Sequence, residues 1–224
     1  MDVDTRVKPL SSVSVCFFIQ NKTNPRGMIF EKCEKGFWFK GGYKKKSAQD
    51  AYLSGDFWVY PSGEHDEGKN AHGSVFPCGA SKGKDMTGES IKEAGFREFQ
   101  EETGFDLQTL EENLDLTAEK FDDGKPFYAL FCRVNGATEM VDSIWADTIK
   151  MIEEAMKEKK DIRDRIESGE KMNFTQNIPK IASDELEKVR SVNYKDMTSI
   201  ETRCERSKII FNHLVSAYRK RFPS

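Results

Sequence analysis

Three glutamates, Glu98, Glu101 and Glu102, lie close together in a stretch that has the pattern of a helix. On a helix of about 3.6 residues per turn, the spacing i, i+3 and i+4 places all three within an arc of about 100°. Carboxylates held this close repel one another and raise one another's pKa values. A hard divalent cation relieves the repulsion, and carboxylate oxygens are the ligands that Mg²⁺ and Mn²⁺ prefer. The spacing therefore indicates a site for a divalent metal ion.

Residues before and within the same stretch could hold this site in shape. Arg97 lies one turn after Glu93 and two turns beyond Glu89. We expect it to lie off the carboxylate face and to tie the helix to the preceding loop by ion pairing. Gly83 and Gly88 let the loop backbone bend, so a main-chain carbonyl could also approach the metal. A run of glutamates taken alone is usually a solvated helix face, and the wider pattern has to decide between the two interpretations.

The wider pattern resembles the signature of the Nudix family of hydrolases, GX5EX7REUXEEXGU, in which U is a bulky apolar residue. Every fixed position of the signature is matched in this chain. With ordinary residue frequencies, a full match by chance is on the order of one in a million. The matching residues are Gly83, Glu89, Arg97, Glu98, Phe99, Glu101, Glu102, Gly104 and Phe105. We call this segment the box.

The resemblance implies an enzyme that uses Mg²⁺ or Mn²⁺ to cleave a phosphoanhydride bond in a nucleoside diphosphate linked to another group. Water attacks a phosphorus atom, and no covalent intermediate is required. Carried over by position, Glu89 and Arg97 form a structural ion pair. The implied metal ligands are the side chains of Glu98, Glu101 and Glu102, with the carbonyl of Gly83 as a further ligand.

Two glutamates are candidates for the general base, because its position varies within the family. One is Glu101 in the box. The other is Glu185, since the segment Asp184–Val189 resembles the stretch that supplies the base in messenger-RNA decapping Nudix enzymes. The alternative is that Glu185 is an ordinary exposed acid before a strand.

The loop that opens the box bears on the substrate. Ser81–Lys84 resembles the Pro-Lys-Gly-Lys opening of decapping and dinucleoside-polyphosphate enzymes, with Ser81 in place of the proline. It departs from the Pro-Gly-Gly opening that is common in nucleotide-sugar enzymes. Lys82 and Lys84 could contact substrate phosphates or could be merely solvated.

Aromatic and basic segments outside the box also bear on the substrate. Trp38 and Trp58 could stack on a base, or belong to a core. The basic runs Lys44–Lys46 and Arg219–Arg221 could hold a phosphate backbone, or be solvated. We expect capped RNA or a dinucleoside polyphosphate as the substrate, then ADP-ribose or a related nucleotide, then a diphosphoinositol polyphosphate; no DNA is expected.

A protein of another class would be a catalytically inactive Nudix module that binds RNA or protein. Such modules typically lose carboxylates of the box. This chain retains all of them, which favours the enzyme.

The elements that must position these residues follow the order of a Nudix fold, an α/β/α sandwich with a mixed sheet. We expect one domain over residues 1–224, with insertions at about 34–73 and 137–181. The patterns predict strands at Ser12–Ile19, Met28–Cys33 and after Ser183–Val189, a hairpin of Leu114–Phe121 with Pro126–Val134, and helices at Ser90–Thr103, Val141–Met156 and Thr202–Phe222.

Composition narrows the class of protein. Hydrophobic residues make up 37% and charged residues 33%, with a formal net charge of -3. This balance excludes an obviously cationic nucleic-acid binder and an acidic disordered tail. The five cysteines are scattered, so reduced thiols are expected rather than a disulfide framework or a zinc site. No signal-type run is seen, and the longest apolar run, Val13–Ile19, is too short to span a bilayer. We expect a soluble, intracellular, cytoplasmic protein; the oligomeric state is open.

Overall fold

The centre of the molecule is a mixed sheet of seven strands. In this computed structural model five strands lie in the order β10-β11-β1-β2-β12, while β6 pairs with β2 and β7 pairs with β1. They span Ser12–Ile19 (β1), Arg26–Lys32 (β2), Ser74–Val75 (β6), Cys78–Ala80 (β7), Leu114–Asp122 (β10), Pro126–Val134 (β11) and Leu186–Asn193 (β12). The structure describes residues 1–32, 35–41, 52–54, 57–64, 73–84, 87–170, 186–197, 199–200 and 205–223.

β1 lies in the middle of the sheet because it is apolar on both of its faces. Phe17 belongs to the core on one side of the sheet, and Phe18 belongs to the core on the other side. β1 runs parallel to β11, with Ser12 opposite Phe127, and antiparallel to β2 and β7. A strand that is buried on both faces has a near-continuous apolar sequence, as β1 has.

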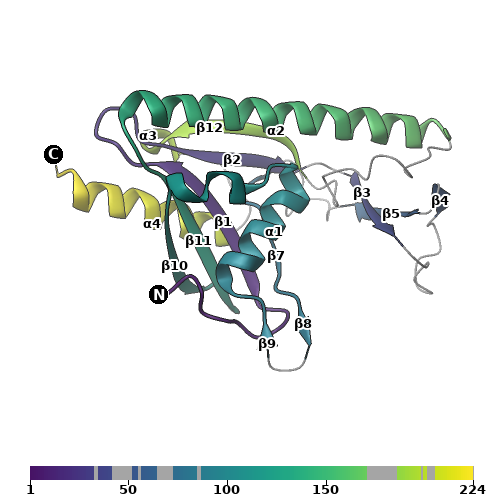
Figure 1. The fold of residues 1–224 in the computed structure, drawn as a ribbon, viewed down its shortest axis with the longest axis horizontal. Coiled ribbons are helices and arrows are strands. Elements are labelled where there is room, and N and C mark those ends of the chain that lie inside the picture. The colour runs from purple at the N-terminus through teal and green to yellow at the C-terminus, as the bar shows by residue number, and fades with distance from the viewer. Residues whose placement is uncertain are drawn as a thin grey trace.

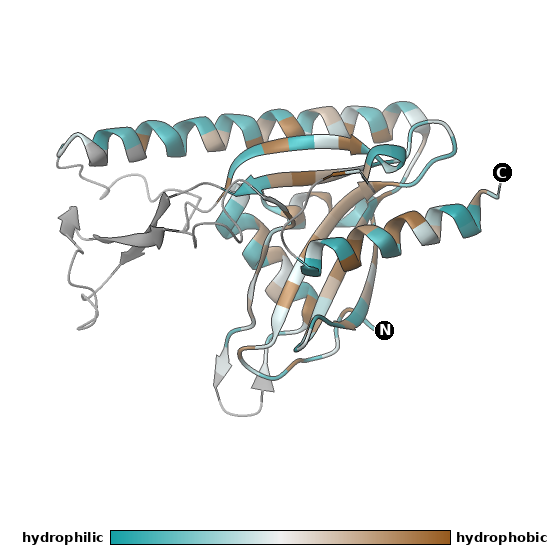
Figure 2. Cartoon of the chain, turned by 180° about the vertical axis from the view of Figure 1, so that it is seen from behind, coloured by the Kyte–Doolittle hydropathy of each residue, from teal (hydrophilic) through white to brown (hydrophobic). Residues whose placement is uncertain are grey.

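Helices cover both faces of this sheet. α1 and α2 pack on one face, α3 and α4 pack on the other, and each face has its own core (Figure 1). In Figure 2 the strands between the helical layers are largely brown, whereas much of α2 is teal. The helices span Ile91–Thr103 (α1), Thr138–Glu167 (α2), Tyr194–Met197 (α3) and Glu205–Arg221 (α4), with a 3-10 helix (η1) at Leu107–Asn113. The predicted α/β/α sandwich with a mixed sheet is confirmed.

α1 begins and ends where its local sequence signals place it. The Ser90 side chain accepts a hydrogen bond from the Glu93 amide, and the Glu93 side chain accepts one from the Ser90 amide. This reciprocal cap satisfies two amide groups that have no partner inside the helix. Gly104 ends the helix with φ 76°, a left-handed conformation that glycine adopts without a steric penalty.

α2 extends beyond the amphipathic segment Val141–Met156, into the charged stretch Lys157–Lys171 that the sequence predicted as exposed helix or loop. Its first half is amphipathic, with Trp145 and Ile152 buried against the sheet. The helix then continues through the charged stretch to Glu167. Lysine and glutamate are good helix formers, so this part needs no apolar contact to remain helical.

The remaining strands lie outside the main sheet. β3 (Lys35–Gly41), β5 (Phe57–Glu64) and β4 (Tyr52–Ser54) form a three-stranded sheet within the first predicted insertion. β8 (Gly83–Lys84) and β9 (Thr87–Gly88) form a small hairpin before α1. The division into one domain with two insertions stays a prediction. None of the helices in the described ranges is both long and apolar enough to cross a membrane.

Candidate metal site

The loop before α1 is closed by hydrogen bonds at both of its ends. The Lys82 amide donates to Glu89 Oε2 at 2.6 Å, and the Glu89 amide donates to the Lys82 carbonyl at 2.9 Å. Ser81 is buried, and its hydroxyl donates to the Lys8 carbonyl at 2.8 Å. Its amide donates to the Ser11 carbonyl, also at 2.8 Å. The serine in place of the family's proline therefore fixes the loop to the N-terminal segment.

Arg97 is the centre of the site. Its Nε and Nη2 atoms donate to the two oxygens of Glu89, each at 2.8 Å. Its Nη1 atom lies 2.5 Å from Glu98 Oε1 and 3.1 Å from Glu101 Oε2. Nη2 also donates to the Ala80 carbonyl at 2.9 Å. We call Arg97 with these three glutamates the arginine clamp, because it joins the loop to the helix.

The expected position of Arg97 off the carboxylate face was wrong. The guanidinium reaches Glu101, one turn further along the helix, while its other edge binds the loop glutamate. The long side chain and the fork of donors make this double contact possible. Glu93, the expected neighbour, is used in the helix cap, and its carboxylate lies 3.8 Å from Arg6.

Contacts in the clamp and burial shift the pKa values of Glu89, Glu98 and Arg97. The hydrogen bond from Arg97 holds the pKa of Glu89 below its ordinary value, although partial burial opposes the shift. Burial raises the pKa of Glu98 above its ordinary value, although the hydrogen bond from Arg97 opposes that shift. Burial disfavours the charged form of Arg97, but its hydrogen bonds to Glu89 and Glu98 raise its pKa overall. Glu98 is thus a desolvated carboxylate whose ionised form is stabilised by nearby positive charge.

Glu98 also lies directly against the backbone of β7. A β-carbon placed on Gly79 would lie 2.1 Å from Cδ and Oε2 of Glu98 and 2.4 Å from Oε1. Only a glycine leaves room for the carboxylate at this position. Sequence reasoning missed Gly79 as a site residue, because the Nudix signature does not include it and the loop's several glycines gave no reason to select it.

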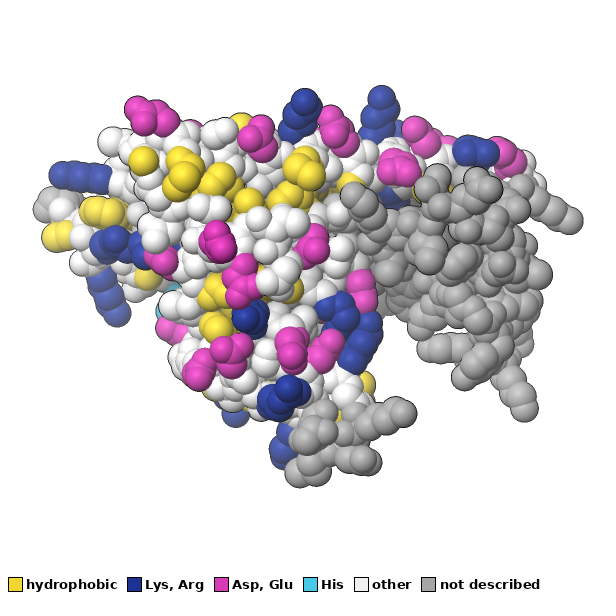
Figure 3. Space-filling model, in the orientation of Figure 1, with side chains coloured by type: hydrophobic (Ala, Val, Ile, Leu, Met, Phe, Trp, Pro, Cys, Tyr) yellow, Lys and Arg dark blue, Asp and Glu magenta, His cyan; other side chains and the backbone are white. Residues whose placement is uncertain are grey.

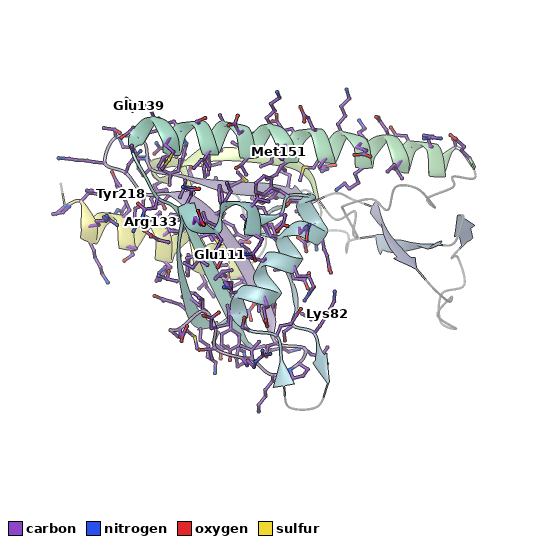
Figure 4. The ribbon with its side chains drawn as sticks, in the orientation of Figure 1. Lys82, Glu111, Arg133, Glu139, Met151 and Tyr218 are labelled. Carbon is purple, nitrogen blue, oxygen red and sulfur yellow. The ribbon has the colours of Figure 1, made fainter. Side chains whose placement is uncertain are left out.

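Lys82 completes the described contacts of the site. Its ammonium donates to Glu101 Oε1 at 2.6 Å, and Figure 4 shows Lys82 beside α1 on the segment that leads into β8. Its side chain is 61% exposed, against 30% for that of Glu101. In Figure 3 basic and acidic side chains are interleaved over this face of the molecule.

No protein-family model matches the chain, and no curated protein matches it in sequence. Solved structures match it over nearly its whole length. A C. elegans Ap4A hydrolase has 11% identity and a TM-score of 0.39, covering 95% of this chain and 99% of its own. A mutT/nudix family protein from Listeria innocua has 11% identity and a TM-score of 0.41, covering 97% and 98%. The NUDIX domain of Shewanella oneidensis NrtR, complexed with ADP ribose, has 8% identity and a TM-score of 0.40, covering 95% and 87%.

These structural neighbours are Nudix proteins. Their identities to this chain and their TM-scores are low, so the resemblance to the Nudix signature rests on the box between Gly83 and Phe105. Both apolar positions of the box are in the core, with Phe99 fully buried and Phe105 6% exposed. The apolar side chains of the box thus lie in the core, and two of its carboxylates, Glu98 and Glu102, are also buried.

The donor set of the Nudix box fits a hard divalent cation. Glu98 is 9% exposed and Glu102 is 6% exposed, so these carboxylates are largely shielded from water. Arg97 forms an ion pair with Glu98, and Lys82 forms one with Glu101. Such pairs are expected where carboxylates need neutralising charge. Within the described ranges, no three Asp, Glu, His or Cys side chains converge as a metal site. The assignment of the box glutamates as metal ligands stays a prediction.

The structure does not test the roles of the other predicted site residues. Gly83 begins β8, and its carbonyl remains a predicted ligand. The side chain of Lys84 lies outside the described part of the chain, as do the side chains of Trp38 and Trp58. Glu185 directly precedes β12 and lies outside the described residues.

Proposed function

We propose that this chain is a Nudix hydrolase that cleaves a phosphoanhydride bond with the help of Mg²⁺ or Mn²⁺. The observation that supports it best is the arginine clamp, in which one guanidinium joins the loop glutamate to two carboxylates of the helix. A surface row of glutamates would have no need of a half-buried arginine at its centre. The complete signature adds to this argument.

In this proposal each residue of the box has its own role. Glu98, Glu101 and Glu102 would hold the cation, with the Gly83 carbonyl as a further ligand. Arg97 would keep two of these carboxylates oriented and the loop in place. A bound Mg²⁺ or Mn²⁺ supplies charge neutralisation of the pyrophosphate and activation of the attacking water.

Two glutamates remain as proposed general bases. Glu101 belongs to the arginine clamp, and each of its oxygens accepts one hydrogen bond from a cationic side chain. Each oxygen keeps a second lone pair that could accept a proton from water. Glu185 is the second proposal and is supported by the likeness of its segment to that of the decapping enzymes.

The proposed substrates are capped RNA or a dinucleoside polyphosphate, then ADP-ribose, then a diphosphoinositol polyphosphate. Lys82 lies at the site and is proposed to contact a substrate phosphate. Lys84, Trp38 and Trp58 are proposed to contact the phosphates and a base. The lysine-containing loop next to the helix supports a substrate with several phosphates, because lysine binds phosphate as a point charge.

The test is turnover of a substrate panel in the presence of Mg²⁺ or Mn²⁺. The panel contains capped RNA, diadenosine polyphosphates, ADP-ribose and inositol pyrophosphates, and the products are separated by chromatography. We expect hydrolysis of at least one substrate of the panel. No turnover by folded, metal-loaded protein would favour a binding module over an enzyme.

Substitutions then separate the roles of the glutamates. Glu101→Gln and Glu102→Gln should each lower kcat by orders of magnitude without unfolding the protein, because glutamine keeps the size but not the charge. Full activity in both variants would contradict the site. Glu185→Gln tests the later base by itself, since Glu185 lies outside the box.

A further inference from the structure

The two oxygens of Glu101 are both bonded to side-chain cations. Lys82 Nζ lies 2.6 Å from Oε1, and Arg97 Nη1 lies 3.1 Å from Oε2. A predicted metal ligand therefore has no oxygen without a charged donor. Each oxygen keeps a second lone pair, but a divalent cation that binds there is repelled by the positive charge already beside it.

Arg97 is held by more contacts than Lys82 and is less exposed to solvent. The Arg97 side chain is 18% exposed and is also bonded to Glu89, Glu98 and a backbone carbonyl. The Lys82 side chain is 61% exposed, and among the described residues its ammonium bonds to Glu101 alone. An exposed ion pair of this kind is worth only about 0–1 kcal/mol. Lys82 is therefore the contact that opens.

The backbone allows this movement without disturbing the loop. The amide and the carbonyl of Lys82 are both hydrogen-bonded to Glu89, so the main chain stays in place. The side chain can leave Glu101 by rotation about its own bonds.

We propose that Lys82 is a positioning residue that occupies Glu101 in the metal-free protein and is displaced when the divalent cation binds. The displaced ammonium then becomes available to a phosphate oxygen of the substrate. This inference rests on the proposed function, and it adds a coupling between the two binding events. Cation binding releases the lysine for the substrate, so each ligand strengthens the binding of the other.

A lysine that is displaced by the metal and a lysine that only binds phosphate differ in their effect on the affinity for the metal. A lysine that only binds phosphate leaves the affinity for the metal unchanged in the absence of substrate. A lysine that must be displaced competes with the cation, so its removal strengthens cation binding. A lysine ammonium beside the carboxylate repels a divalent ion twice as strongly as it repels a singly charged one, and removal of the ammonium ends that repulsion.

The test is Mn²⁺ binding to the substrate-free protein, measured by electron paramagnetic resonance of the free ion. Lys82→Met should lower the Kd for Mn²⁺ about fivefold or more, because the competing charge is gone. In the same variant, KM for the substrate found in the panel should rise while kcat changes less. Lys82→Arg, which keeps the charge, should bind Mn²⁺ much as the wild type does.

The matched control is Lys120→Met, which removes the same charge from an exposed position of β10. It should leave the Kd for Mn²⁺ unchanged. Thermal unfolding shows whether each variant is folded, and Lys82→Met should be, since its backbone contacts do not involve the side chain.

An unchanged or raised Kd for Mn²⁺ in Lys82→Met overturns the displacement, as does an equal decrease in Lys120→Met. A rise in KM without tighter Mn²⁺ binding shows a simple phosphate contact and also overturns it. If no substrate is turned over, the proposed function fails, but the Mn²⁺ measurement still decides whether Lys82 competes with the cation.

Discussion

Gly79→Ala tests whether Glu98 has to lie directly against β7. The added β-carbon would lie 2.1 Å from Cδ and Oε2 of Glu98 and 2.4 Å from Oε1. Ordinary contact between such atoms is about 3.5 Å, so the carboxylate would have to move by more than about 1 Å. Gly79 lies in the middle of β7 and has no positive φ, so the methyl group by itself adds no backbone strain.

The movement should affect the metal more than the fold. Overpacking typically costs about 1–3 kcal/mol, and we expect the lower end because the displaced atoms end a side chain with several rotamers. Ligands have to be held within about 0.5 Å of their productive position. We therefore expect the free energy of unfolding to fall by about 1 kcal/mol, and the Kd for Mn²⁺ to rise about tenfold or more.

Urea denaturation and Mn²⁺ titration measure the two effects. Gly27→Ala is the matched control, because its β-carbon would lie 2.4 Å from the terminal methyl of Met197, on the opposite face of the sheet from α1. It should destabilise the protein by a similar amount and leave Mn²⁺ binding unchanged. Wild-type Mn²⁺ affinity in Gly79→Ala would refute the role of this glycine, as would an equal loss of affinity in both variants.

The origin of the stability loss can be checked separately. In a Glu98→Ala background the obstructing carboxylate is absent, so Gly79→Ala should add little further destabilisation. If the full loss persisted in that background, the clash would not involve Glu98.

Three further predictions concern the clamp, the contact between α1 and η1, and the buried thiols. Arg97→Lys should lower the free energy of unfolding by about 2 kcal/mol in urea, because an ammonium cannot bond loop and helix together; unchanged stability would contradict the clamp. The hydrogen bond from Lys92 lowers the pKa of Glu111. The pair therefore stabilises the folded protein above the pKa of an unfolded-state glutamate, about 4.3, and this stabilisation is lost as the pH falls through the lower pKa of Glu111 in the folded state. Lys92→Met should therefore be less stable than wild type at pH 7 and equally stable near pH 2; a gap that does not depend on pH would count against the pair. Mass-mapped alkylation of the native protein should spare the two thiols whose pKa is raised by burial, Cys16 and Cys132, and rapid labelling of either would show that it is not buried.

The boundaries of α1 could be predicted because their signals are local. Ser90 with Glu93 fixes the start of the helix and Gly104 fixes its end, and each depends on neighbours within one turn. Phe99, which matches an apolar position of the signature, is fully buried. Local sequence was also enough for β1 and for the hairpin of β10 with β11, since each has a strand pattern bounded by turn residues.

The geometry of the site could not be predicted in the same way. Whether Arg97 turns toward or away from the carboxylates depends on where the loop holds Glu89, which is decided by contacts with the N-terminal segment. The role of Gly79 depends on the register of β7 against β1, which brings it beneath α1. These are contacts between distant parts of the chain, and a single sequence carries no direct signal for them.

The parallel pairing of β1 with β11 has a consequence for how the chain is made. Position 12 pairs with position 127, so the central strand lacks its parallel neighbour β11 until residue 127 has been synthesised, although β2 and β7 are made earlier. Folding that depends on contacts between distant parts of the chain is slow. An apolar strand that is exposed in the nascent chain is prone to aggregation. A nascent chain that ends before Pro126 would therefore expose β1 and be a natural client for chaperones, whereas one that extends past Val134 could close the centre of the sheet.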